Sequence, residues 1–240
     1  MSTTIIRPVS RDDVIGLLSR KWFSDTETRY LNHHAQRFAE TLAMLQPLIS
    51  KPSFRLLDVG PHMLTGAIAE QFHSVPIQIS TIGWWSERLA PESLLNHHLD
   101  WDLNVELPEG AHPDGPFDGI LMAETIEHLH TSPKIVLGGF ARQLRPSGWL
   151  CLQTPNAAAL SKRIRLLLGR NPYEMIREDT HNPGHFREYT MNELISIGQE
   201  AGLTVTRASY MNYWRSRGWR GVAEDLRPTF RNGLTVIFTK

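Results

Sequence analysis

Cysteine, long apolar runs and an excess charge of one sign are all scarce or missing in this sequence. The single cysteine, Cys151, excludes an internal disulfide and is typical of a reducing compartment, so we expect a cytoplasmic protein. No apolar run approaches the length of a membrane span, and the opening residues MSTTIIRPVSRDD do not read as a signal peptide. The 25 basic and 25 acidic side chains balance, so no overall field draws nucleic acid to the chain.

What the chain does contain is an alternation of short apolar strands with helical segments. Its 240 residues, 41% of them hydrophobic, are enough for one buried core. Strands that alternate with helices indicate a parallel sheet covered on both faces. No helical crossover separates the last two predicted strands, so we expect them to pair antiparallel through a long loop. The predicted strands cover residues 54–59, 75–82, 117–123, 149–154, 203–210 and 234–239.

The first 50 residues predict a helical cap on a main domain at residues 51–240. Phe38, Leu42 and Leu45 recur at helical spacing and give one apolar stripe, which continues to Ile49. Further helices are predicted at 64–72, after Ser132-Pro133, and from a capping box of Thr190 and Glu193. Arg145 to Gly148 are expected to form a turn.

The stretch LLDVGPHMLTG, residues 56–66, has the outline of a ligand-binding loop. In open α/β sheets, ligands bind beyond the carboxyl ends of the strands, at the first crossover. Gly60 lets the backbone turn tightly there, and Asp58 suits a cationic or hydroxylated ligand. The alternative is that Asp58 only caps the next helix. Where such loops usually carry a second glycine, this chain has His62.

Five stretches, in the right order and at plausible spacing, resemble the class I S-adenosylmethionine-dependent methyltransferases. The resemblance covers roughly residues 54–240, and it implies a Rossmann-like, mostly parallel sheet of seven strands with an antiparallel final hairpin. It also implies an enzyme with S-adenosylmethionine as methyl donor. The stretches are LLDVG (56–60), DLNVELP (102–108), FDGILMAETIEHL (117–129), LRPSGWLCLQTPN (144–156) and HFREYTMNEL (185–194).

The resemblance assigns residues to the two ends of the methyl donor. Asp58 and Gly60, with His62 in the same loop, match positions that hold the methionine end, and Ala123 falls where the fourth strand opens beside the methyl group. Asp102 matches the acid that binds the adenine amino group, with Asp100 as the alternative, and Leu103 flanks the adenine ring.

The acid that normally binds the ribose hydroxyls is missing from the end of the second strand. The chain reads IGWWSE there, so Trp84 or Trp85 stands in its place. A tryptophan can stack on adenine but cannot accept hydrogen bonds from ribose. We expect the loss of a charged acceptor to cost about 1.5 to 3 kcal/mol of donor affinity.

The segment ETIEHLH, just past the fourth strand, brings acidic and imidazole groups together. If it is helical, Glu124 shares a face with Glu127 and His128. The pattern resembles O-methyltransferases of ubiquinone biosynthesis and of small-RNA 2′-hydroxyl groups, in which it binds a divalent metal with a further histidine; His185 matches that histidine. One interpretation is therefore a Mg²⁺ or Mn²⁺ site. The others are that His128 or His185 is a general base, or that the segment only caps and packs.

The insertion at residues 157–188 is the expected acceptor lid. Its basic amphipathic segment predicts a helix whose leucines pack on the core while its arginines face solvent, and contact with a membrane is the less favoured alternative. The basic residues are Lys162, Arg163, Arg165 and Arg170.

The leading hypothesis is O-methylation of a small-molecule, sugar or lipid-linked glycan acceptor. A non-catalytic binding module that kept the fold is the second hypothesis, motivated by His62 and the tryptophan pair. RNA 2′-O-methylation is the third, and the zero net charge counts against it.

Overall fold

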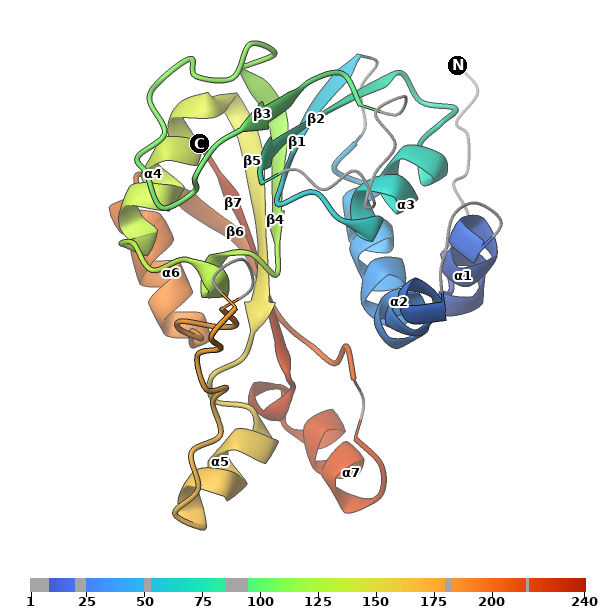
Figure 1. Ribbon diagram of the computed structural model, residues 1–240, viewed down its shortest axis with the longest axis vertical. Coiled ribbons are helices and arrows are strands. Elements are labelled where there is room, and N and C mark those ends of the chain that lie inside the picture. Colours follow the sequence, from blue (N-terminus) through green and yellow to red (C-terminus); the bar gives the residue numbers. More distant parts are fainter. Residues whose placement is uncertain (1–8, 20–24, 50–52, 85–94, 180–182, 215) are drawn as a thin grey trace.

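The structure, a computed structural model, is one seven-stranded sheet between two layers of helices (Figure 1). It describes residues 9–19, 25–49, 53–84, 95–179, 183–214 and 216–240. The strand order is β3-β2-β1-β4-β5-β7-β6. Strands β1 to β5 pair parallel, whereas β7 pairs antiparallel with both β5 and β6. The predicted Rossmann-like sheet with a reversed final hairpin is confirmed.

Six of the seven strands follow the predicted ones closely, with one early start, and β3 is the strand that was not among the predicted ranges. The predicted turn at 145–148 lies inside β5, where Ser147 has a φ of 63° and the register with β4 shifts between Phe117 and Gly119. The residues predicted to form a turn are therefore part of the longer strand β5, where they produce a local irregularity in its pairing with β4. The strands are β1 (Phe54–Val59), β2 (Ile77–Gly83), β3 (His98–Asp100), β4 (Phe117–Ala123), β5 (Leu144–Pro155), β6 (Thr204–Met211) and β7 (Gly233–Thr239).

Helices cover both faces of the sheet and bury one apolar cluster on each (Figure 1). On one face lie α1 (Arg11–Ser19), α2 (Asp25–Leu45) and α3 (Met63–Gln71); on the other lie α4 (Pro133–Gln143) and α6 (Met191–Glu200). The predicted stripe of α2 is buried as expected, since Phe38, Leu42 and Leu45 are all inaccessible to solvent.

The capping box of α6 forms as the sequence predicts. The Thr190 hydroxyl accepts a hydrogen bond from the Glu193 amide at 3.4 Å, and Glu193 Oε2 accepts one from the Thr190 amide at 2.8 Å. Two orphan donors at the helix start are thereby satisfied.

Two short helices project beyond the carboxyl edge of the sheet (Figure 1). They are α5 (Leu160–Leu167) and α7 (Trp219–Leu226), accompanied by the 3₁₀ turn η3 (Pro228–Phe230). The long loop before β7 carries α7, and β6 and β7 pair antiparallel as expected. The leucines in and after α5 were expected to pack on the core, and this is wrong: Leu166, Leu167 and Leu168 are exposed. Among the described helices, none is both long and apolar enough to cross a bilayer.

Candidate active site

The backbone of the loop between β1 and α3 requires a glycine at one position, and Gly60 stands there. Gly60 has a φ of 72°, in the left-handed region, and a Cβ there would lie 2.8 Å from Oγ1 of Thr125. His62 has φ −152° and ψ −175°, which is extended backbone that any residue adopts. The loop therefore keeps its shape with a histidine at the position where related loops carry a second glycine.

Asp58 is held at the end of β1 by the first turn of α3. Its Oδ2 accepts a hydrogen bond from the Thr65 hydroxyl at 2.5 Å, and Thr65 Oγ1 accepts one from the His62 amide at 2.8 Å. Asp58 thus supports the helix start indirectly, through Thr65, and also lines a cavity. The side chain is only 3% exposed, and burial raises the pKa of its carboxyl to about 7. A cationic ligand beside it would favour the charged form.

A small cavity of about 80 Å³ lies above this loop. Its lining joins three elements that are far apart in the sequence: α2, the β1–α3 loop and the end of β4. The lining residues are Tyr30, Arg37, Asp58, Gly60, His62, Leu64, Ala123 and Glu124.

Arg37 is the residue of this cavity that sequence reasoning missed. It is a buried guanidinium on α2, and it makes a side-chain hydrogen bond with Tyr30. A signal was present, because Tyr30, His34, Arg37 and Thr41 follow one another at spacings of four, three and four, beside the apolar stripe. A charged residue in such a row is typical of a helix that faces a polar site.

Glu124, directly after the carboxyl end of β4, has a strained backbone conformation. Its φ of 54° lies in the left-handed region, which is uncommon for glutamate, and its amide donates to Gln153 O at 2.9 Å. Its buried Oε1 has no hydrogen-bond partner among the described residues. Burial raises the pKa of Glu124, and the charges of Arg37 and Lys162 oppose that shift.

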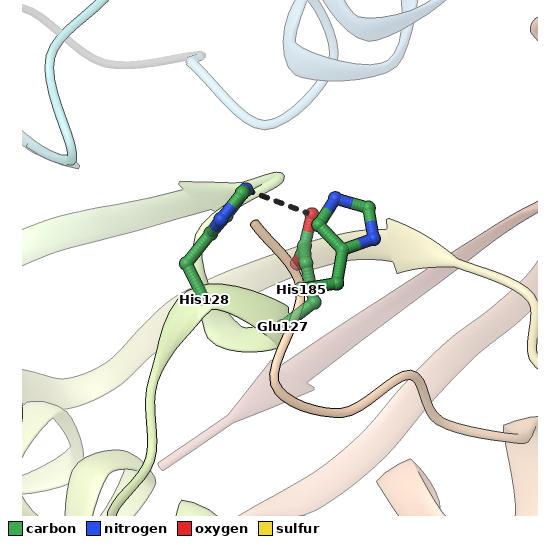
Figure 2. Close-up of side chains that lie close together, drawn as sticks. All are labelled: Glu127, His128 and His185. Atoms are coloured by element: carbon green, nitrogen blue, oxygen red, sulfur yellow. Dashed lines mark ion pairs between the residues drawn. The ribbon is translucent and has the colours of Figure 1, made fainter. Parts of the chain in front are cut away.

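The segment after Glu124 does not form the helix that the sequence analysis considered. Only the 3₁₀ turn η2, Ile126–His128, is present. It brings Glu127 and His128 beside His185 (Figure 2). One ligand atom from each of these three side chains lies within 4.8 Å of the others, and Glu124 is not part of that group.

Both histidines present an unprotonated nitrogen to this cluster. His128 Nδ1 lies 2.9 Å from Gly184 O, and since a carbonyl only accepts, we assign the proton to Nδ1. His185 Nδ1 lies 3.4 Å from the Glu188 carboxylate, which assigns its proton in the same way. Burial lowers the pKa of both rings, that of His185 to about 4. The Nε2 atoms are therefore available to accept a proton or to bind a metal ion.

Glu127 joins the two chain segments of the cluster. Its backbone carbonyl accepts the Phe186 amide at 2.8 Å, which places the loop that carries His185. Its fully buried carboxylate accepts the Thr154 hydroxyl at 2.8 Å through Oε2, whereas Oε1 has no partner in the described part of the chain. Burial and then the charge of Glu124 raise the pKa of Glu127 well above its ordinary value. Such a group needs either a proton or a cation.

Lys162, in the first turn of α5, borders the same cluster. Its ammonium donates to Asn156 O at 3.1 Å and forms an ion pair with Glu188, which also lies against His185. Burial lowers the pKa of Lys162 to about 8, although Glu124 and Glu127 act in the opposite direction. The role of Glu188 in linking α5 to His185 could not be read from the sequence.

The expected adenine side lies on the loop after β3. The strand ends at Asp100, and the exposed Asp102 accepts hydrogen bonds from the Asn104 amide at 2.9 Å and its Nδ2 at 3.0 Å. Asn104 Oδ1 in turn accepts the His130 amide at 2.8 Å, which ties this loop to the segment after η2. Leu103 Cδ1 would lie 3.7 Å from a Cβ placed on Gly83.

The position of the missing ribose acid is only partly described. Trp84 directly follows β2 and is 58% exposed, so its ring is open to a ligand or to solvent. Trp85 lies outside the described residues. No acidic side chain ends β2.

Comparisons with known proteins find similar sequences over most of the chain. The profile of a family described as a methyltransferase domain matches residues 30–208. A ubiquinone biosynthesis O-methyltransferase from Thiobacillus denitrificans is 28% identical over 205 residues, which cover 82% of this chain and 83% of that protein.

Two solved structures share the fold. A SAM-dependent methyltransferase from Archaeoglobus fulgidus matches with a TM-score of 0.57 and 16% identity, over 90% of this chain and 100% of that one. A 1,6-didemethyltoxoflavin-N1-methyltransferase from Burkholderia thailandensis matches with a TM-score of 0.55 and 15% identity, over 100% and 93%. The second methylates nitrogen by its name, so the fold alone does not select the acceptor atom.

Proposed function

Since the chain belongs to the methyltransferase domain family and is an enzyme that uses S-adenosylmethionine, we propose that it methylates an oxygen atom of a small-molecule, sugar or lipid-linked glycan acceptor. The observation that carries the proposal is the adjacency of two features at one edge of the sheet. Glu124, which lines the cavity with Arg37 and Asp58, is close enough to Glu127 of the cluster with His128 and His185 for its charge to act on that carboxyl. The family match also counts against a non-catalytic module.

The residues of the cavity fit the amino-acid end of the methyl donor. That end carries a carboxylate and an ammonium, and Arg37 offers a buried positive charge for the first. Asp58 and the unpartnered Oε1 of Glu124 offer acceptors for the second. The bare backbone of Gly60 permits close approach. When bound, the donor supplies a methyl group on a sulfonium, which is already strongly electrophilic.

The acceptor side needs a group that takes a proton from a hydroxyl. His128 is neutral, and its Nε2 can accept that proton while Gly184 O keeps the ring oriented. His185 is the second candidate for the same role. Orientation of the hydroxyl by these side chains is the larger part of the catalysis that we propose.

A divalent metal ion is the alternative use of the same atoms. Glu127 Oε1 and the two Nε2 atoms form a mixed oxygen and nitrogen set, and the buried unpartnered oxygen fits a cation. When bound, Mg²⁺ or Mn²⁺ would lower the pKa of an acceptor hydroxyl. We propose this set of three, without Glu124, as the candidate metal site.

The choice of oxygen is supported by the name of the curated relative, an O-methyltransferase, and by the neutral bases of the cluster. RNA as acceptor stays a weaker proposal, because the chain carries no net charge. Donor binding is proposed for Asp58, Gly60, His62, Trp84, Trp85, Asp102, Leu103 and Ala123, as the resemblance implies.

The test is transfer of a labelled methyl group to a panel of catechols, phenols, sugars, lipid-linked sugars, amines, thiols and a short RNA. Each reaction is run with EDTA and with Mn²⁺, using wild type, Glu127→Gln and the control Glu106→Gln, whose carboxylate pairs with Arg142 at the surface. We expect a hydroxyl-bearing small molecule or glycan to be labelled, and Glu127→Gln alone to lose activity. Label only on amines or thiols, or only on RNA, would contradict the proposed acceptor.

A further inference from the structure

Exposed apolar side chains are concentrated on the two projecting helices and on the chain that follows α5, away from the sheet. Of the thirteen large hydrophobic residues that are exposed in the described part of the chain, nine lie on residues 160–179 or 216–231. We call these two segments the arms. The nine are Leu166, Leu167, Leu168, Tyr173, Met175, Ile176, Trp219, Val222 and Leu226. Such a concentration marks an interaction surface.

The two arms form one connected surface. The ring of Phe230, in η3, is covered by the guanidinium of Arg163 at 5.2 Å and by that of Arg227 at 5.3 Å. α5 and the segment after α7 are thereby linked, and both point away from the sheet in the same direction (Figure 1). A single flat partner can therefore contact both.

The outward charge of the arms is positive. Together the two segments contain nine basic and five acidic residues, in a chain whose total charge is zero. Charges of both signs are already engaged: Glu174 pairs with Arg177, Lys162 pairs with Glu188 outside the arms, and the buried Glu224 accepts hydrogen bonds from Ser216 and Asn212. The exposed basic side chains include Arg163, Arg165, Arg170, Arg217, Arg220 and Arg227.

We propose that the arms dock this enzyme reversibly on an anionic lipid surface. Apolar side chains on short helices, with arginines around them and a tryptophan among them, match the composition of interfacial membrane anchors. A second copy of the chain is a poorer occupant, because a self-complementary interface would bring the same arginines face to face. Docking is independent of methyl transfer.

The position of the arms gives this surface a link to the site. Lys162, in the first turn of α5, pairs with Glu188, and Glu188 holds the ring of His185. A lipid surface that contacts α5 would thus lie close to the proposed acceptor side. An acceptor with a lipid tail could reach the site from that surface, and this step alone rests on the proposed function.

The experiment is co-sedimentation with vesicles of phosphatidylcholine alone and of phosphatidylcholine with about one third phosphatidylglycerol. We expect binding to the anionic vesicles only, and release as salt rises. Leu167→Glu/Leu226→Glu, at positions 87% and 81% exposed, should lower the vesicle-bound fraction about tenfold or more. Val105→Glu/Ile135→Glu, at positions 55% and 43% exposed but outside the arms, makes the same charge change and should retain binding within about twofold.

Three outcomes would overturn the proposal. One is that wild type fails to bind either vesicle, and another is that both double variants lose binding equally. The third is a concentration-dependent dimer in sedimentation velocity that only the arm variant dissociates, since the occupant would then be a second copy. Circular dichroism and donor titration of each variant separate a folding defect, and a failure of the proposed function, from a loss of docking.

Discussion

The Nε2 atom of His128 lies 4.0 Å from Oε1 of Glu127. This separation is too long for a hydrogen bond, yet both atoms are buried or partly buried and face each other (Figure 2). Each side chain is held from behind, His128 by Gly184 O and Glu127 by the Thr154 hydroxyl. Two fixed atoms that face each other in this way would hold a third atom between them, either a metal ion or the oxygen of an acceptor.

Glu127→Gln tests which third atom is shared. If it is a metal ion, the neutral amide should weaken Mn²⁺ binding about tenfold or more, since the charged oxygen of the set is lost. Because the pKa of Glu127 is raised, Mn²⁺ must displace a proton, so wild-type affinity should rise with pH. Calorimetric titration of Mn²⁺ at several pH values measures both effects.

The matched control for this titration is Glu106→Gln, which removes an exposed carboxylate and should leave Mn²⁺ binding unchanged. Equal Mn²⁺ affinities for wild type and Glu127→Gln would contradict the metal site. Methyl transfer that persists in EDTA but fails in His128→Ala would then assign His128 as the base.

Arg37→Met tests the charge that α2 contributes. We compare the affinities of S-adenosylmethionine and of methylthioadenosine, which lacks the amino-acid end. In wild type the first should bind more tightly, and Arg37→Met should reduce this preference about tenfold or more, because a buried partner of the carboxylate is lost. Arg29→Met, an exposed position on the same helix, should leave it unchanged. A preference that survives Arg37→Met would mean that the carboxylate binds elsewhere.

Asp58→Asn should stabilise the protein at neutral to alkaline pH. The folded-state pKa of about 7 lies above the ordinary value of 3.8, so folding favours the protonated form. The free energy of unfolding therefore falls as pH rises from about 4 to about 7, and asparagine escapes that loss. We expect a gain on the order of 2 to 4 kcal/mol near pH 8 that shrinks towards pH 4.

Urea unfolding at a series of pH values measures the Asp58→Asn effect. The affinity of Asp58→Asn for S-adenosylmethionine should be lower than that of wild type, because the amide no longer offers a negative charge to the ammonium of the donor. If Asp58→Asn is no more stable than wild type near pH 8, ionisation of the buried Asp58 carboxyl does not lower the free energy of unfolding, and the prediction is contradicted.

Gly60→Ala should abolish donor binding and destabilise the fold. The added Cβ would sit 2.8 Å from Thr125 Oγ1, in addition to the cost of a positive φ. Gly110→Ala separates the two effects, because Gly110 has a φ of 67° with nothing within 4 Å of its Cβ. We expect thermal unfolding to show a loss of about 1 to 2 kcal/mol for Gly110→Ala and clearly more for Gly60→Ala. Equal losses of stability in Gly60→Ala and Gly110→Ala would show that the close approach of Thr125 to residue 60 contributes nothing.

Elements with a strong local pattern were predictable from the sequence. β1 and β4 begin and end at the predicted residues because each is a short, mostly apolar run bounded by turns. The Thr190 capping box and the stripe of Phe38 on α2 follow from spacing alone. β3 was not predicted because its three residues are too few to show the two-residue period of a strand.

Features that depend on how elements meet were not predictable. The burial of Arg37 follows from where α2 crosses the β1–α3 loop, and its own neighbours in the chain do not specify that crossing. Likewise, an amphipathic pattern indicates that α5 has an apolar side, but it does not indicate whether that side packs against the core. The exposed side chain of Leu167 shows that the apolar side faces solvent.

The most direct test of the account is calorimetric titration of S-adenosylmethionine, in EDTA, into wild type, Arg37→Met and His185→Ala. The account predicts micromolar binding to wild type, strong weakening by Arg37→Met, and near-normal binding to His185→Ala, because we propose that Arg37, in the cavity, binds the donor and that His185, in the cluster, faces the acceptor. No binding to wild type up to millimolar concentration, or equal losses in both variants, would contradict the division of this site into donor and acceptor halves.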